Sequence, residues 1–177
     1  MTSHLTIPVG PDDHRTGPAD AAATLVEYGD YECPYCGQAY PIVNDLLTQV
    51  GDQVQFVFRN FPISTSHPHA EIAAEAAESA AAQGKFWEMH DALYEHQRSL
   101  SPEHIVGLAN QIGLDIEQFE DDLVQRRFEE RVRNDFMGGV RSGVNGTPSF
   151  FINGTRFDGD WTGDGLHVAI SRLLGER

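Results

Sequence analysis

The strongest constraint on the fold is the segment 24–60, in which a strand, a helix and a second strand follow one another. Residues 24–28 are mostly strand-forming and stop at a Gly-Asp pair. Apolar residues then recur at helical spacing over 42–50, and they alternate with other residues over 54–58. Two short strands joined through a helix predict a βαβ unit, in which the strands are parallel.

A block of helices is expected to follow this unit. From about residue 65 to 142 the apolar spacing is helical throughout. Ser101 precedes a proline at a first helical position, and Asp115 precedes Gln118 by three residues, so both mark helix starts. Apolar residues recur every four positions from Phe128 to Val140, which predicts a further helix with one apolar stripe.

The chain then returns to strands. Residues 149–157 alternate around an Asn-Gly dipeptide, which predicts a β-hairpin, and apolar residues at helical spacing over 166–174 predict a last helix. The order βαβ, helices, ββα predicts one α/β domain over 21–175 with a mixed central sheet and a helical insertion at about 65–142. We interpret 1–20 as an arm over the surface.

Composition and the N-terminus narrow the possible partners and locations. The chain has 177 residues, with 12 basic and 27 acidic side chains and a formal charge of −15, which argues against binding nucleic acid or an anionic membrane surface. No run approaches the roughly 18 to 20 apolar residues of a membrane span. Residues 1–10 lack the basic start and apolar run of a secretory signal, so we expect a cytoplasmic location, and Leu5 to Val9 are read as a short edge strand.

The two cysteines, Cys33 and Cys36, are separated by Pro34 and Tyr35 at the predicted start of the first helix. Free N–H groups and the positive end of the helix dipole favour a thiolate there, so we expect Cys33 to be an exposed nucleophile of low pKa and Cys36 to resolve a mixed disulfide. Pro34 suits the first turn because its missing N–H costs nothing. Half of a zinc site is the alternative, but no second cysteine pair completes four ligands, so we expect no metal.

Two distant motifs, residues 26–36 and residues 144–154, resemble the DsbA-like thiol:disulfide oxidoreductases of the thioredoxin-fold superfamily. The resemblance covers roughly residues 20 to 175, including the helical insertion. It implies a thioredoxin fold and a cis peptide bond at Thr147-Pro148, next to the cysteines, in a loop that pairs with the substrate backbone. Together with Tyr35 and Pro34, this loop is the expected substrate-binding site.

The resemblance also bears on Glu27 and on the reduction potential. Relatives often keep a buried acid at the position of Glu27 that passes protons to the resolving thiol, and a desolvated carboxyl has a raised pKa suited to this task. The alternative is a solvated acid at the edge of the strand. Tyr35 replaces the histidine of the strongly oxidising DsbA enzymes, and Cys-Pro-Tyr-Cys is the glutaredoxin motif, so we expect a potential of roughly −200 to −230 mV.

Charged groups near the cysteines leave two questions. Asp30 and Glu32 flank Cys33 and are expected to raise its pKa, against the helix dipole. His67 and His69 are metal-ligand candidates, but the intervening proline favours a loop that leads into a helix.

These observations favour a thiol:disulfide oxidoreductase that acts on protein or small-molecule thiols and disulfides without a bound cofactor. One alternative is a glutaredoxin-like reductase with glutathione as co-substrate. Another is a client-binding or chaperone module, because related domains occur joined to ion antiporters, and by that resemblance a membrane transporter is a possible partner.

Overall fold

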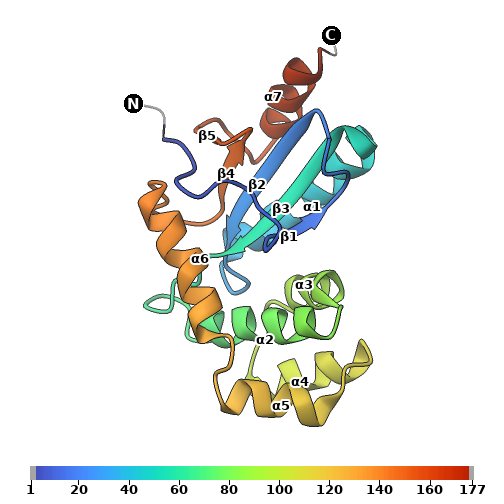
Figure 1. Cartoon of the computed structure of the whole chain (residues 1–177), viewed down its shortest axis with the longest axis vertical. Coiled ribbons are helices and arrows are strands. Elements are labelled where there is room, and N and C mark those ends of the chain that lie inside the picture. The colour runs from blue at the N-terminus through green and yellow to red at the C-terminus, as the bar shows by residue number, and fades with distance from the viewer. Residues whose placement is uncertain (1–2, 176–177) are drawn as a thin grey trace.

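The computed structural model describes residues 3–175, and its centre is a five-stranded mixed sheet (Figure 1). The strand order is β1-β3-β2-β4-β5; β2 and β3 are parallel, and the other neighbours are antiparallel. The thioredoxin fold and the βαβ unit are thereby confirmed. The strands are β1 (His14–Thr16), β2 (Ala23–Gly29), β3 (Val54–Asn60), β4 (Ser149–Ile152) and β5 (Thr155–Phe157).

Helix α1 (Pro34–Val50) connects the two parallel strands and is followed by a single 3-10 turn at Gly51–Gln53. Helices α2 to α5 gather at one end of the sheet, and α6 leads back from them to β4 (Figure 1). The remaining helices are α2 (Ala70–Ala82), α3 (Phe86–Glu95), α4 (Pro102–Gln111), α5 (Ile116–Val124), α6 (Glu129–Arg141) and α7 (Gly165–Leu174).

Local signals account for where several of these elements begin and end. The Ser101 side chain accepts a hydrogen bond from the His104 N–H, and the Asp115 side chain accepts one from the Gln118 N–H, so both predicted caps are confirmed. The predicted hairpin is also confirmed, with its turn at Asn153-Gly154.

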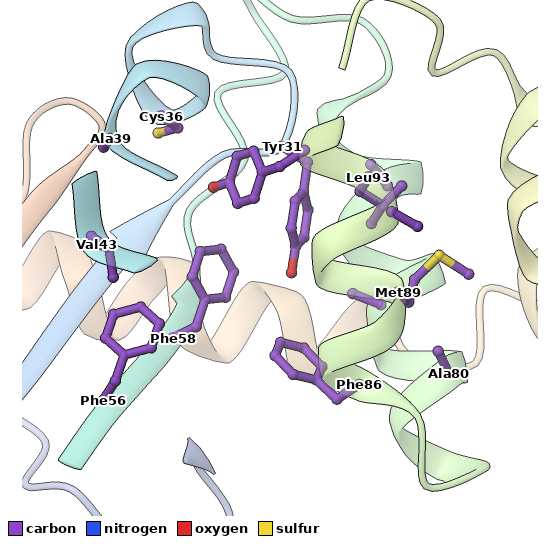
Figure 2. Packing of buried hydrophobic residues seen from close by; sticks show 14 of the residues in the cluster. Tyr31, Cys36, Ala39, Val43, Phe56, Phe58, Ala80, Phe86, Met89 and Leu93 are labelled. Carbon is purple, nitrogen blue, oxygen red and sulfur yellow. The ribbon is translucent and has the colours of Figure 1, made fainter. Parts of the chain in front are cut away.

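One face of the sheet forms a continuous core with α1 and the helical insertion. Figure 2 shows the rings of Phe56 and Phe58, on β3, between the α1 side chains and those of α3. Tyr31 lies beside His90 and Tyr94 of α3, with ring centroids 5.5 and 4.9 Å apart. The segment that carries the cysteines is therefore packed directly against the insertion.

On the opposite face, α6 packs on the sheet with part of the predicted apolar stripe: Val132 is buried, and the Phe136 ring stacks on Phe61 with the centroids 4.3 Å apart. Val140, also expected in the stripe, is 45% exposed, which corrects the prediction there. Gly138 and Gly139 are buried instead, and a Cβ at Gly139 would lie 2.7 Å from the Phe61 ring and 3.0 Å from that of Tyr28. Bulky rings on the sheet thus require small residues on the helix. The spacing of apolar residues along the sequence does not indicate this requirement.

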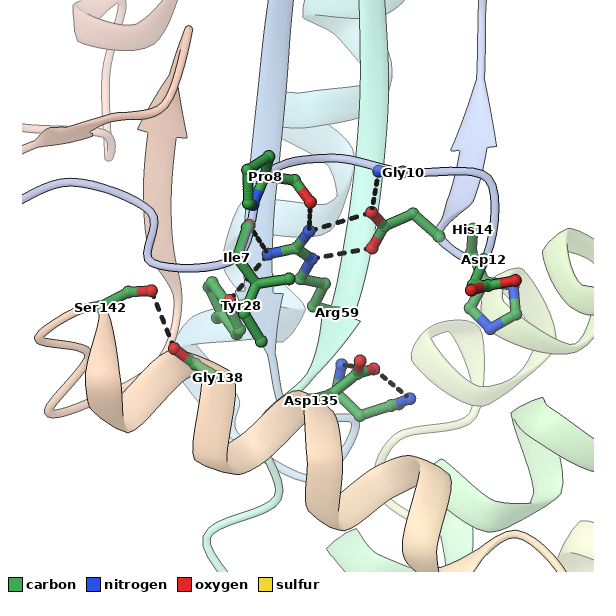
Figure 3. Close-up of polar contacts among 12 residues, drawn as sticks. Ile7, Pro8, Gly10, Asp12, His14, Tyr28, Arg59, Asp135, Gly138 and Ser142 are labelled. Carbon is green, nitrogen blue, oxygen red and sulfur yellow. Dashed lines mark hydrogen bonds and ion pairs between the residues drawn. The ribbon is translucent and has the colours of Figure 1, made fainter.

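The arm contains the second correction, because the short edge strand lies at His14–Thr16 and not at 5–9. Figure 3 shows what holds residues 7–13 in place: the Arg59 guanidinium donates hydrogen bonds to the carbonyls of Ile7 and Pro8 and to both carboxylate oxygens of Asp13. The position of the strand follows from this tertiary anchor, whereas local propensity favours residues 5–9.

Candidate active site

The cysteine pair lies at the start of α1, just after the loop that follows β2. Cys33 is the N-cap residue, Pro34 is the first helical residue, and Cys36 follows in the first turn. Both cysteines are free thiols. Only 4% of Cys33 is exposed, so its expected exposure was wrong; its Sγ lies 3.4 Å from the carbonyl oxygen of Thr147, which covers it. Cys36 is completely buried.

The surroundings of Cys33 stabilise its thiolate. A hydrogen bond from the Cys36 thiol is the main cause, and it lowers the pKa of Cys33 to about 5 against the opposing effect of desolvation. The nearby Thr147 side chain and hydrogen bonds from the backbone N–H groups of Cys36 and Tyr35 act in the same direction. Cys33 is therefore ionised near neutral pH.

The surroundings of Cys36 have the reverse effect. Burial raises the pKa of its thiol, and the hydrogen bond to Cys33 and the charge of Glu27 raise it further. The backbone N–H of Asp30 lies 3.4 Å from its Sγ and offers a hydrogen bond. The two thiols thus differ in acidity: the pKa of Cys33 is lowered and that of Cys36 is raised.

Glu27 lies in the middle of the sheet, opposite Phe58 on one side and Phe150 on the other. Only 2% of it is exposed, and among the described residues its Oε1 has no hydrogen-bond partner, so the alternative of a solvated edge acid is wrong. Burial, and to a lesser degree the negative charge of Cys33, raises its pKa to about 8. Such a carboxyl can accept or return a proton near neutral pH.

The Thr147-Pro148 peptide bond is cis, and this loop borders a hollow of about 460 Å³ on the surface. Tyr35 forms another part of the wall and is 61% exposed, while Arg156 and Trp161 from the hairpin region close the far side. The structure thus brings three of the predicted substrate-binding residues to one hollow. Pro34, the fourth, is not part of this wall.

Two acid–histidine pairs flank the cysteines. The buried Asp30 carboxylate lies 2.8 Å from His67 Nδ1 and also accepts the N–H of Ile63, and the Glu32 carboxylate lies 2.9 Å from His69 Nδ1. Burial lowers the pKa of His67, but the hydrogen bond to Asp30 and the charges of Asp30 and Cys33 together outweigh burial, so the pKa is raised. The pKa of Cys33 is nevertheless lowered, so the opposing effect expected of the two acids does not outweigh the hydrogen bonds to its sulfur.

The sequence did not single out Gln97, which follows α3. Its side-chain amide donates hydrogen bonds to the backbone carbonyls of Tyr31, at 2.9 Å, and Cys33, at 2.7 Å. No motif marks such a residue, because its role depends on how the insertion folds back onto the cysteines.

Within residues 3–175, no group of three or more histidine, cysteine or acidic side chains is placed to hold a metal ion. Over the same residues, none of the helices combines the length and apolar character that crossing a bilayer requires.

The family described as Thioredoxin matches residues 10–172. A sodium/proton antiporter, NhaA 1 of Salinispora arenicola, is 47% identical over 175 residues, which are 98% of this chain and 27% of the antiporter. NhaA 3 of Salinispora tropica is 46% identical over 94% of this chain and 26% of its own length. The chain therefore spans about a quarter of the length of these curated relatives.

Among solved structures, oxidised BdbD from Bacillus subtilis superimposes with a TM-score of 0.86 at 22% identity, over 98% of this chain and 97% of BdbD. A thioredoxin-like oxidoreductase from Silicibacter pomeroyi gives a TM-score of 0.81 at 28% identity, over 95% of each chain.

Proposed function

The chain belongs to the thioredoxin family and is DsbA-like within it, and on this premise we propose that it is a thiol:disulfide oxidoreductase acting through Cys33 and Cys36. The observation that carries the proposal is the divided acidity of the two thiols. Cys33 has a pKa of about 5, while the pKa of Cys36 is raised by burial. In disulfide exchange by a dithiol, the more acidic thiol attacks the substrate as a thiolate, and the other thiol resolves the mixed disulfide.

In the reducing direction, the Cys33 thiolate attacks one sulfur of a substrate disulfide. The substrate S–S bond breaks, a mixed disulfide forms, and the first substrate sulfur leaves as a thiolate. Cys36 then loses its proton to the Glu27 carboxylate and attacks the Cys33 sulfur. The second substrate thiol is released and the Cys33–Cys36 disulfide remains; the reverse sequence oxidises a dithiol.

The hollow beside Thr147 and Pro148 is proposed to hold the substrate. The half-buried Thr147-Pro148 loop borders the hollow beside Cys33, and the exposed ring of Tyr35 adds apolar surface to its wall, which suits an extended peptide. The substrates would then be proteins or small molecules that carry a thiol or a disulfide.

A trapping experiment tests the mechanism. The Cys36→Ser variant, mixed with intact insulin or a peptide disulfide, is expected to accumulate a mixed disulfide that disappears with dithiothreitol. The Cys33→Ser variant serves as the control and should trap nothing and turn nothing over. Turnover by Cys33→Ser would overturn the mechanism.

The glutathione equilibrium decides how oxidising the pair is. We propose a potential of roughly −200 to −230 mV, the range of glutaredoxins, as expected from the tyrosine between the cysteines. A value near −120 mV, as in the most oxidising DsbA enzymes, would contradict it. A glutathione-dependent reductase remains the alternative, and turnover that requires glutathione and ignores protein dithiols would favour it.

The curated relatives suggest one partner. Because they are sodium/proton antiporters about four times as long as this chain, we propose that a membrane transporter is a partner of this fold here as well. The test is co-expression of this chain with the part of the Salinispora arenicola antiporter that it does not match, in which co-purification is expected and its absence counts against the partnership. The cytoplasmic location stays a prediction.

A further inference from the structure

We propose that Gln97 is a positioning residue for the Cys33 nucleophile: its side-chain amide clamps the backbone on both sides of Glu32 and so aligns the first turn of α1. The proposal deepens the proposed function and rests on it, because it concerns the same site. It assigns a task to the helical insertion beyond covering the core.

The clamp uses both protons of one amide nitrogen. Gln97 Nε2 donates to the carbonyl of Tyr31 at 2.9 Å and to the carbonyl of Cys33 at 2.7 Å. An amide NH₂ group has two donors, so this group is fully used. The Cys33 carbonyl also accepts the N–H of Gly37, at 3.1 Å, as the first hydrogen bond of the helix. One oxygen thus joins the clamp to the helical ladder.

Gly37 shows how closely the amide fits. A Cβ at this position would lie 2.2 Å from Gln97 Oε1 and 2.9 Å from Gln97 Cδ, so any larger residue must displace the amide. Glycine is a poor residue for a helix interior, costing about 1 kcal/mol relative to alanine. The close approach of Gln97 explains its presence in the first turns of α1.

Gln97 is itself held by the insertion. Its backbone N–H donates to the carbonyl of Tyr94, and the buried Tyr94 ring packs on Tyr31 and Tyr40, with centroid distances of 4.9 and 5.2 Å. The clamp therefore joins the C-terminal end of α3 to the segment before Cys33. Thr147 covers the Cys33 sulfur from β4's side of the site, so separate parts of the chain fix the backbone and the sulfur.

The chemical consequence concerns the thiolate. The N–H groups of Tyr35 and Cys36 lower the pKa of Cys33 only while the first turn directs them at its sulfur. Without the Gln97 hydrogen bonds, the backbone at the start of α1 is held less firmly, and the N–H groups of the first turn stabilise the thiolate less. Loss of the Gln97 donors should therefore raise the pKa of Cys33.

The test is the thiolate titration of the reduced full-length protein, followed by absorbance at 240 nm. Gln97→Ala is expected to raise the midpoint for Cys33 by about half a pH unit, the size of a helix-terminus effect. Gln97→Glu keeps the length but puts an oxygen where the donor was, and it should raise the midpoint further. Gln83→Ala is the matched control, because Gln83 Nε2 also binds a backbone carbonyl, that of Asp115, away from the cysteines, and its loss should leave the midpoint unchanged.

A double-mutant cycle identifies the contact. Gly37→Ala should raise the midpoint in the wild-type background, because the new Cβ displaces the amide, and should change it little once Gln97→Ala has removed that amide. Urea unfolding of each variant shows that the titrated protein is folded. An unchanged midpoint in folded Gln97→Ala, or additive effects of the two substitutions, would overturn the proposal.

This readout is independent of turnover. If Cys36→Ser traps no mixed disulfide while Gln97→Ala still shifts the Cys33 titration, the proposed function fails and the clamp stands. If trapping succeeds and the titration does not move, the clamp fails alone.

Discussion

The Glu27 carboxyl is expected to make the folded protein much less stable as the pH rises. Replacing Glu27 by glutamine should abolish this pH-dependent loss of stability. In the unfolded chain the group ionises near its ordinary pKa of 4.5, whereas burial raises the pKa to about 8 in the folded protein. Above about pH 4.5 the unfolded state gains a favourable charge that the folded state adopts only as the pH approaches about 8. The contribution of this group to stability is therefore lost progressively as the pH rises from about 4.5 to about 8, and the loss is complete above that pH.

The magnitude follows from the separation of the two pKa values. A difference of about 3.5 pH units is equivalent to about 5 kcal/mol, of which about 3.5 kcal/mol is lost between pH 5 and pH 8. The glutamine variant has no such loss, although its buried, incompletely bonded amide costs roughly 1 to 3 kcal/mol at every pH. The change with pH is therefore the informative quantity.

The assay is urea unfolding of the reduced wild type and the variant at several values between about pH 5 and pH 8. Cys33 titrates with the opposite sign in this range, because its pKa is lowered in the folded state, so the two proteins must be compared at each pH. The variant should gain about 3.5 kcal/mol relative to wild type over the range. Two curves that run parallel from pH 5 to pH 8 would refute the reasoning.

Three further changes test other contacts. Arg59→Met leaves the Asp13 carboxylate without its buried partner and should cost about 3 to 5 kcal/mol in urea unfolding, with faster proteolysis of the arm. Because the pKa of His67 is raised in the folded protein, its pairing with Asp30 stabilises the fold at lower pH and is lost as the pH rises through that pKa. His67→Gln should therefore flatten the fall in the free energy of unfolding above about pH 6.5. An unchanged pH profile would count against this pairing. Gly139→Ala should destabilise by roughly 1 to 3 kcal/mol through its clash with Phe61, while Gly107→Ala, with open space around its Cβ, should not; equal effects in urea unfolding would contradict the packing argument.

Much of the fold could be predicted because its signals are local. The strand-forming run of β2, the alternation in β3, the caps at Ser101 and Asp115 and the Asn-Gly turn of the hairpin each depend on residues within a few positions of one another. The glycines through which α6 meets the sheet could not be predicted in the same way, because Gly139 is buried only where the rings of Tyr28 and Phe61 come close.

The candidate site divides along the same line. The cysteines and Glu27 could be found from their spacing and from the resemblance. The partners of the flanking acids could not: His67 and His69 meet Asp30 and Glu32 across 37 positions of the chain. Such contacts, like the hydrogen bond from the Cys36 thiol that mainly lowers the pKa of Cys33, exist only in the folded protein.

The most direct test of the account is the pH dependence of alkylation of the reduced protein by iodoacetamide, with the modified cysteine identified by peptide mass. Thiolates react and thiols do not, so the midpoint of the rate profile reports the pKa of the reacting group. We expect a midpoint near pH 5 and modification of Cys33, with Cys36 untouched. A midpoint near about 8.5, the value of an ordinary cysteine, or preferential modification of Cys36, would contradict it.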